Sequence, residues 1–317
     1  MIRMLTVLVG LAALAWSGWW VVGRNAALSG IEAGIVAAEA QGWTIAYDDL
    51  GVAGFPNRFD TTATDLSVAT PEGWGLTAPF LQVFALSYRP NHVIAVAPHE
   101  MRVATPAGAA EIRSDDLRAS AVTSPSRGEI DRATVTAEAL TLDGRGWTVG
   151  LSSGQVAVRQ AGGPETYEIA AGLSDIRPGG PAWEAMPPGP LPARIGAVRL
   201  DALVMLDGPA IAGATPSFRS VDLRSLSMGW DGVRLDLSGP IRVDSDGLPS
   251  GSLTLRAEGW RDLLGMAVAA GFVTGVQEPL LAAGLGGLSQ PDGSVEIPVV
   301  LRGGVISLAG FPLGPIF

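Results

Sequence analysis

The side chains that most often carry out chemistry in proteins are few in this sequence, and their spacing does not assemble a catalytic site. His92 and His99 are the only histidines, and an odd separation along a strand places them on opposite faces, where they cannot share a metal ion. There is no cysteine and no lysine, so all 21 basic side chains are arginines. These absences exclude disulfide scaffolds, thiolate metal sites, cysteine nucleophiles, Schiff-base enzymes and phosphate-loop NTPases.

Three further patterns look chemical but are better explained by structure. Gly150–Gly154 matches G-x-S-x-G, yet a nucleophile elbow needs a strand, a sharp turn and a helix, whereas the residues that follow here continue as strand. Asp244–Gly247 begins like a calcium loop, but the next ligand position is a leucine, which indicates a hairpin turn. In Asp48-Asp49 and Asp115-Asp116, adjacent carboxylates point to opposite faces of a strand. We therefore expect no enzyme activity, no cofactor and no bound metal ion.

Length, charge and composition restrict the class of protein further. At ~100–200 residues per domain, a chain of 317 residues forms one large domain or two ordinary ones. The formal net charge of −10 argues against a nucleic-acid partner. Charged residues make up only 16% of the chain and hydrophobic residues 47%, while 42 glycines and 23 prolines interrupt it. Such a chain is apolar and rich in turns rather than disordered.

The N-terminal segment predicts a membrane anchor. The chain is uncharged from Met4 to Val22, with Arg3 before this run and Arg24 after it. At ~1.5 Å per residue the run reaches about 28 Å, close to the ~30 Å hydrocarbon core of a bilayer. Three tryptophans lie near its far end, where amphipathic rings prefer the membrane interface: Trp16, Trp19 and Trp20. Residues 1–24 are therefore expected to be a transmembrane anchor.

A cleaved signal peptide is the alternative, because Ala13-Leu14-Ala15 is an acceptable small-x-small cleavage site. The apolar run continues past that site, which favours the uncleaved anchor. Both interpretations send the rest of the chain across the membrane, and the charges that follow Arg24 are acidic. We expect a single pass through the inner (cytoplasmic) membrane with the bulk of the protein in the periplasm.

Beyond the anchor, the hydrophobic period changes from helical to strand-like. Residues 25–42 show helical spacing that ends at a glycine, and clean alternation of apolar and charged residues appears in Val233–Leu237 and Leu253–Glu258. Asp-Gly pairs predict hairpin turns at 143–144, 207–208, 231–232, 246–247 and 292–293. Residues 218–258 should therefore form a three-stranded antiparallel meander.

These patterns predict a mainly β protein with an N-terminal transmembrane helix: a large antiparallel sheet, curled and packed with a few helices (α+β). A proline-rich stretch at 178–194 separates a first β-rich half (43–177) from a second one (195–317). One continuous sheet and two separate cores both remain open. In the second half, residues 260–288 predict helices. An uncharged helix over 261–276 is too short to span a membrane and is expected to pack on the sheet.

The sequence also resembles a family of bacterial single-span envelope proteins whose domain has no known function. The resemblance covers nearly the whole chain, and its sharpest element is the Gly-Phe-Pro-x-Arg motif at Gly54–Arg58; Trp74–Ala95 and Gly303–Gly314 add to it. This family carries no established activity or catalytic residue. More distantly the chain resembles AsmA-like proteins, which implies a long sheet folded lengthwise into a lipid-holding groove.

Two functions follow as expectations. A one-sided sheet of this size has more apolar face than its few helices can cover, and a lengthwise curl would turn that face into a groove for phospholipid acyl chains. Inward positions such as Leu235 and Leu255 should line the groove, and Arg58 is the first candidate for contact with a lipid headgroup. The alternative is a structural or protein-interaction module of the cell envelope, with a filled β core.

Overall fold

The computed structural model describes residues 2–184, 192–211, 216–244, 246–269, 273–309 and 311–315. The helices are α1 (Ile2–Ala40), α2 (Pro181–Glu184), α3 (Trp260–Ala269) and α4 (Glu278–Gly287). The first strands are β1 (Thr44–Ala46), β2 (Asp49–Ala53), β3 (Arg58–Ala69), β4 (Gly75–Leu86), β5 (Arg89–Val96), β6 (Glu100–Thr105), β7 (Gly108–Arg113), β8 (Asp116–Thr123) and β9 (Ile130–Gly144). They continue as β10 (Trp147–Gln160), β11 (Thr166–Gly179), β12 (Ile195–Leu206), β13 (Phe218–Trp230), β14 (Val233–Val243), β15 (Pro249–Glu258), β16 (Val295–Arg302), β17 (Val305–Leu308) and β18 (Phe311–Pro315).

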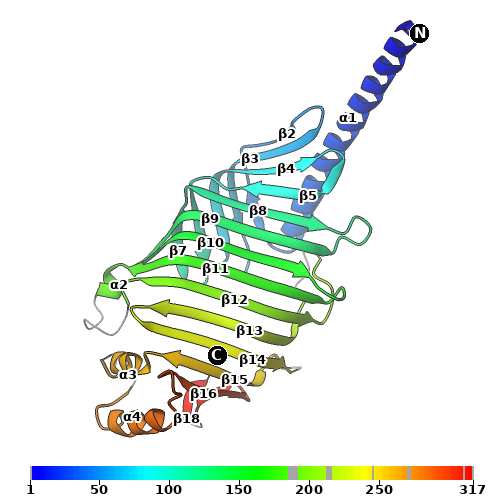
Figure 1. Ribbon diagram of the computed structural model, residues 1–317. Coiled ribbons are helices and arrows are strands. Elements are labelled where there is room, and N and C mark those ends of the chain that lie inside the picture. Colours follow the sequence, from blue (N-terminus) through cyan, green and yellow to red (C-terminus); the bar gives the residue numbers. More distant parts are fainter. Residues whose placement is uncertain are drawn as a thin grey trace.

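All of these strands belong to one antiparallel sheet (Figure 1). From β9 to β18 each strand pairs with the next along the chain. Between β4 and β9 the sheet divides: β5 and β8 fill one half of the gap and β6 and β7 the other. Because β11 pairs directly with β12, the two expected halves form one continuous sheet; residues 185–191 of the proline-rich stretch lie outside the described residues.

The predicted meander over residues 218–258 is confirmed as β13, β14 and β15. Its first turn is Asp231-Gly232, where both residues have positive φ (41° and 84°), as the Asp-Gly signal requires. The turn predicted at 143–144 is wrong by two residues. Gly144 pairs with Trp147, so the two-residue loop is Arg145-Gly146, with the glycine at φ 86°.

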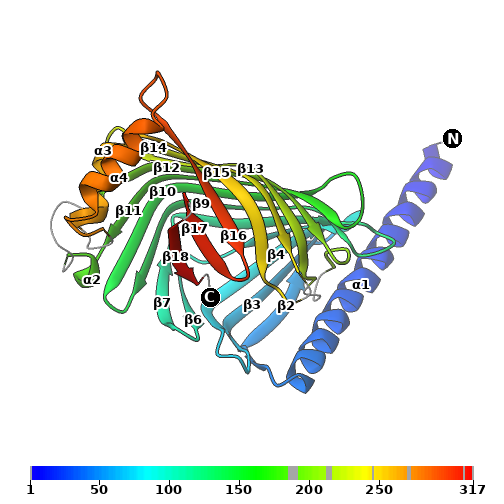
Figure 2. The same cartoon turned by 90° about the horizontal axis from the view of Figure 1, so that it is seen from below.

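A row of irregular positions crosses the sheet where its strands bend. Asp65 in β3, Ala139 in β9 and Asp175 in β11 have positive φ (48°, 48° and 56°). Each interrupts the pairing with its neighbours, and the break between β7 and β8 continues the same line. We call this line the crease. The sheet curves about it into an arch, with β6 and β7 on one wall and β13–β15 on the opposite wall (Figure 2).

The apolar face of the sheet lies on the inner side of this curve. A Cβ added at Gly154 would lie 3.1 Å from Leu173 Cδ2 and 3.3 Å from Leu151 Cδ1, so the side chains on this face converge beside the crease. The phase of the alternation also shifts there: Val135 and Ala137 precede the crease in β9, and Leu140 and Leu142 follow it. The shift keeps apolar side chains on the same face through the bend.

The helices pack against the apolar face at its margins. The expected anchor and the helix expected at 25–42 form one unbroken helix, α1, and Gly42 (φ 89°) follows its end. Trp260 of α3 and Leu285 of α4 pack against Ala257 and Val295. The helix predicted over 261–276 is shorter than expected. Thr274–Gln277 form a turn in which the Gln277 side chain accepts hydrogen bonds from Thr274, and residues 270–272 are outside the described part.

Candidate functional site

The inner face of the sheet carries an unbroken row of directly paired side chains. We call this row the apolar ladder: Thr61, Val83, Ala95, Ala119, Val135, Val156, Ala171, Leu200, Leu226, Leu237, Leu255 and Ile297. It runs from β3 to β16, one residue per strand. At about 4.8 Å between neighbouring strands the ladder is roughly 50 Å long. Every member after Thr61 is apolar, so the sheet presents a hydrophobic strip across almost its whole width.

The far part of this face, on β12–β16, is a filled core. Ala202, Val204 and Leu223 are buried together with Tyr167, while Leu253, Val299 and Leu301 form a second cluster. Ala257 and Val295 are fully buried under α3 and α4. Leu235 and Leu255, which were expected to line a groove, lie on the apolar face but pack against these buried residues. They belong to the closed half of the sheet.

The near part of the face, on β4–β11, is built differently. Its ladder positions are alanine or valine, which are smaller than the leucines of the far part. Val135 and Val156 face each other across β9 and β10 and are 43% and 41% exposed. These two valines are exposed although they lie in a continuous apolar face whose far part is covered. We therefore take the near part as the candidate functional site.

The N-terminal helix α1 docks at the edge where this near part begins. Trp20 Nε1 donates to the Arg58 carbonyl oxygen (2.7 Å), and Arg24 Nε donates to the Val52 carbonyl oxygen (3.0 Å). The Trp20 ring packs with Val52 and Phe59 in a small buried cluster. Phe59 itself pairs with Ala85 on the inner face, so α1 is joined to the same face that carries the ladder.

Gly23 allows α1 to approach the sheet this closely. A Cβ at this position would lie 2.4 Å from Phe59 Cζ, and the Phe59 ring is buried. We expect Gly23→Ala to destabilise the docked helix by about 1–3 kcal/mol, the usual cost of overpacking. The melting temperature in detergent should fall accordingly. Gly18→Ala is the control, because a Cβ there has nothing within 4 Å; equal melting temperatures for the two variants would contradict the packing role.

Arg58, the candidate headgroup contact, lies at the junction of α1 and the sheet. Its side chain is 57% exposed and forms an ion pair with Asp60 (Nη2–Oδ2, 2.6 Å), and its guanidinium lies 5.8 Å from the centre of the Phe84 ring. Asp60 thus already occupies part of its donor capacity. The guanidinium has five N–H groups, so donors remain for a phosphate oxygen. Its role in headgroup binding stays a prediction.

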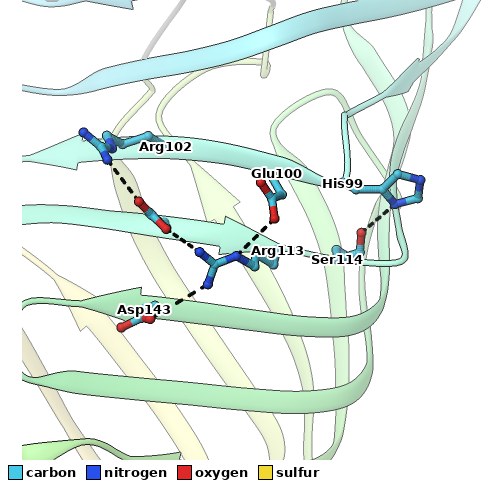
Figure 3. Close-up of polar contacts among 7 residues, drawn as sticks. His99, Glu100, Arg102, Arg113, Ser114 and Asp143 are labelled. Carbon is cyan, nitrogen blue, oxygen red and sulfur yellow. Dashed lines mark hydrogen bonds and ion pairs between the residues drawn. The ribbon is translucent and has the colours of Figure 1, made fainter.

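Ion pairs are concentrated on the opposite, outer face. Figure 3 shows one group on β6, β7 and β9, in which Arg113 bridges Glu111 (2.6 Å) and Glu100 (3.3 Å). Arg102 binds the same Glu111 at 3.0 Å. A second group joins Arg224 to Glu168 and Asp201. The contacts with Glu168 and Asp201 raise the pKa of Arg224. The pKa of Glu168 is lowered, most strongly by the hydrogen bond from Arg159 and next by that from Arg224. Such exposed pairs hold neighbouring strands in register and contribute little stability each.

Each histidine makes a polar contact with a serine of a neighbouring segment. His92 Nε2 lies 3.1 Å from Ser120 Oγ on the neighbouring strand, and His99 Nδ1 lies 2.9 Å from the Ser114 carbonyl oxygen beside the crease (Figure 3). Gly150–Gly154 lies within the continuous strand β10, as the sequence predicted. In the described ranges, no group of three or more metal-binding side chains comes together.

A depression on the outer face has a volume of about 480 Å³ and lies over β9–β11, where the side chains are small. Residues that line it include Ser153, Ala157, Ala170 and Gly172. Its one charged lining residue is Glu138, without a histidine or an arginine among the lining residues that the structure describes. It therefore offers no acid–base pair or nucleophile with a base.

Asp292, next to β16, gives a pH-dependent contribution that can be measured. Hydrogen bonds from Ser294, and then the pairing with Arg256, lower its pKa from 3.8 to about 2. A pKa that is lower in the folded state stabilises the protein above the unfolded value, and the contribution is lost as the pH falls from about 4 to about 2. NMR titration should give this low pKa. Asp292→Asn should remove this part of the acid dependence of unfolding; an unchanged acid profile would contradict it.

Several features of the candidate site were not predicted from the sequence. The role of Gly23 depends on the contact of α1 with Phe59 of β3, and the crease depends on contacts between distant strands. The broken alternation around Ala139 in β9 was the one visible signal of the crease, and it was visible only as an irregular strand. The division of the apolar face into a filled and an exposed half had no signal beyond the change from alanine and valine to leucine.

Comparison with known proteins gives a family but no activity. No curated protein and no solved structure matches this chain. A family model described as an uncharacterised protein conserved in bacteria (DUF2125) matches residues 20–316, which include the β sheet and α1 from Trp20 onward. The chain therefore belongs to the bacterial DUF2125 family.

Proposed function

We propose that this protein is a non-catalytic envelope protein that α1 anchors in the inner membrane. In the periplasm, the near part of the apolar face of its sheet binds phospholipid acyl chains. Within the described residues, α1 is the one helix long and apolar enough to cross a membrane. It joins the sheet at β2 and β3, the edge from which the near part of the apolar face extends. The binding surface would therefore stand beside the bilayer from which its ligand comes.

The observation that carries the proposal is the exposed pair Val135 and Val156 in the middle of the apolar ladder. Apolar surface in water costs about 25 cal/mol per Å², so an exposed valine pair within a continuous apolar face favours an apolar occupant. An acyl chain gains about 0.8 kcal/mol for each buried CH₂ group. The ladder positions of β4–β11 are small side chains that would fit against such a chain, and a lengthwise curl also agrees with the more distant AsmA-like resemblance.

The periplasmic position is supported by charge. Arg3 precedes the apolar run, and after Arg24 the next charged residues are Glu32, Glu39, Asp48 and Asp49. Positive charge favours the cytoplasmic side of a span, but Arg24 balances Arg3, so this support comes only from the acidic residues that follow. The negative net charge also means that an anionic headgroup would be held by individual arginines rather than by the overall field, and Arg58 at the helix junction is the first candidate.

The second candidate is a structural or protein-interaction module, and the filled core on β12–β16 favours it. The two candidates differ in the near half of the sheet. If the module is the correct description, the near half is covered by a protein partner or by the sheet itself, and no lipid is held there.

The experiment uses the full chain with a photoreactive residue at Val156 on the inner face or at Gln155 on the outer face. Crosslinking is carried out in membranes, and the purified product is analysed by mass spectrometry. Phospholipid captured from position 156 and absent at 155 supports lipid binding. Capture of protein alone at position 156, or equal lipid capture at both positions, contradicts it.

A further inference from the structure

Two hairpin turns beside the anchor carry exposed aromatic side chains. The β2–β3 connection (Gly54–Asn57) contains Phe55, which is 58% exposed, and the β4–β5 turn (Ser87–Tyr88) contains Tyr88, which is 60% exposed. We call these two turns together the aromatic lip. Large aromatic side chains grouped on two adjoining exposed turns are typical of sites that meet a partner or a membrane interface.

The aromatic lip is fixed to the membrane helix at a defined depth. Trp16 Nε1 donates to the Pro56 carbonyl oxygen (3.0 Å), and Trp19 Nε1 donates to the Ser87 carbonyl oxygen (3.3 Å). The two turns are also joined to each other, since the Ser87 N–H donates to the Asn57 carbonyl oxygen (2.9 Å). These bonds make the lip and this part of α1 one unit.

The contacts of the aromatic lip with α1 lie within the residues of the expected membrane span. A hydrocarbon core of ~30 Å needs about 20 helical residues, so a span that starts at Met4 ends near Gly23. The contact of Trp16 with Pro56 lies seven residues earlier along the helix, which corresponds to roughly 10 Å. The lip is therefore attached to α1 at a level that the bilayer occupies.

The chemistry of the lip suits the boundary between headgroups and acyl chains. Phe55 packs edge-on against Trp20, with 5.4 Å between the ring centres, and so extends the tryptophan belt of the helix. Arg58 and Arg89 follow the two turns and are exposed. Aromatic rings with arginines behind them are the usual composition of protein segments at this boundary, where the rings enter the membrane and the guanidinium groups reach phosphate oxygens.

We propose that the aromatic lip inserts into the outer leaflet of the inner membrane at the headgroup–acyl boundary, as a second membrane contact beside α1. The inference rests on the proposed function in one respect: α1 must be a retained membrane span. Insertion would place β3 and β4, which carry the first two positions of the apolar ladder, at the bilayer surface. An acyl chain could then pass from the leaflet to the ladder without crossing water.

The absence of cysteine makes the test direct, because any introduced cysteine is unique. The full chain is labelled with an environment-sensitive NBD group at Tyr88→Cys or Phe55→Cys and reconstituted into vesicles of phosphatidylcholine and phosphatidylglycerol. Some of the phosphatidylcholine carries a nitroxide quencher near the top of an acyl chain. Leu11→Cys, in the middle of the expected span, reports whether the anchor itself is inserted.

Trp74→Cys is the matched control, because Trp74 is also an exposed aromatic residue on a hairpin turn (54%). It lies at the other end of the β3–β4 hairpin, where Gly42 meets Pro71 beyond the C-terminal end of α1. That end is about 35 Å along the helix from Trp16. A label there should remain in water.

With a lip inserted ~5–10 Å into the interface, the labels at 88 and 55 should lose about half of their emission to the quencher, whereas the label at 74 should lose none. Equal behaviour of positions 88 and 74, with position 11 quenched, overturns the insertion and leaves the anchor intact. Failure of quenching at position 11 overturns the anchor and the inference together. Should Phe55→Cys disturb the Trp20 contact, Tyr88→Cys alone decides the result.

Discussion

Replacing Val156 with arginine should abolish phospholipid capture while the protein stays folded. Val156 is 41% exposed at the centre of the apolar ladder, so an arginine there keeps its charge in contact with water when the site is empty. With an acyl chain bound, the guanidinium would have to lie against hydrocarbon and lose its hydration. We expect at least a ~10-fold drop in bound lipid, which corresponds to about 1.4 kcal/mol.

The measurement is the phospholipid content of purified protein by native mass spectrometry, with the circular dichroism melting curve as the test of folding. Gln155→Arg is the matched control, since it adds the same charge at the adjacent position on the outer face. Lipid content that is equal in the two variants would show that the inner face is not where lipid binds. A Val156→Arg protein that melts far below the Gln155→Arg protein would instead indicate that this position is part of a closed core.

Replacing Val204 with aspartate should destabilise the protein more than any other single change considered. Val204 is 3% exposed and packs with Tyr167, Ala202 and Leu223 in the filled half of the sheet. An aspartate there is buried without a partner, and the loss should be about 4 kcal/mol or more in the free energy of unfolding. The protein either melts at a much lower temperature or fails to accumulate.

Met205→Asp controls for the added charge, because Met205 is the next residue, points to the outer face and is 43% exposed. This variant should melt within a few degrees of the unchanged protein. Val204→Thr, which is milder and almost isosteric, should fall between the two and keeps the comparison possible if the aspartate variant cannot be purified. A Val204→Asp protein as stable as Met205→Asp would refute a filled core on β12–β14.

Together, the two experiments distinguish the exposed half of the apolar face from its filled half. A charge at position 156 is expected to affect ligand binding and leave folding unchanged, whereas a charge at position 204 is expected to affect folding. The difference arises from the size of the side chains. Larger side chains fill the far half, and α3 and α4 cover part of it, whereas the ladder positions of the near half are alanines and valines, of which Val135 and Val156 are exposed.

The sequence alone determined the features that depend on neighbours along the chain. The uncharged run from Met4 to Val22 predicts a candidate membrane helix because helix length and apolar length must match the bilayer. The alternation in residues 218–258 predicts the meander, since strand faces repeat every two residues and Asp231-Gly232 adopts the positive φ of a hairpin turn. The one-sided apolar pattern also indicates an inner and an outer face.

Only the tertiary structure decided how these faces are used. The crease requires Ala139 and Asp175 to fall in line across separate strands, and α1 docks on the sheet through Trp16 and Pro56, which are 40 positions apart in the sequence. The separation of the filled half from the exposed half likewise depends on which strands α3 and α4 cover. Such features arise from strand register and from contacts distant in the chain, and local hydrophobic periodicity carries no information about either, because every strand of a one-sided sheet shows the same alternation wherever it lies.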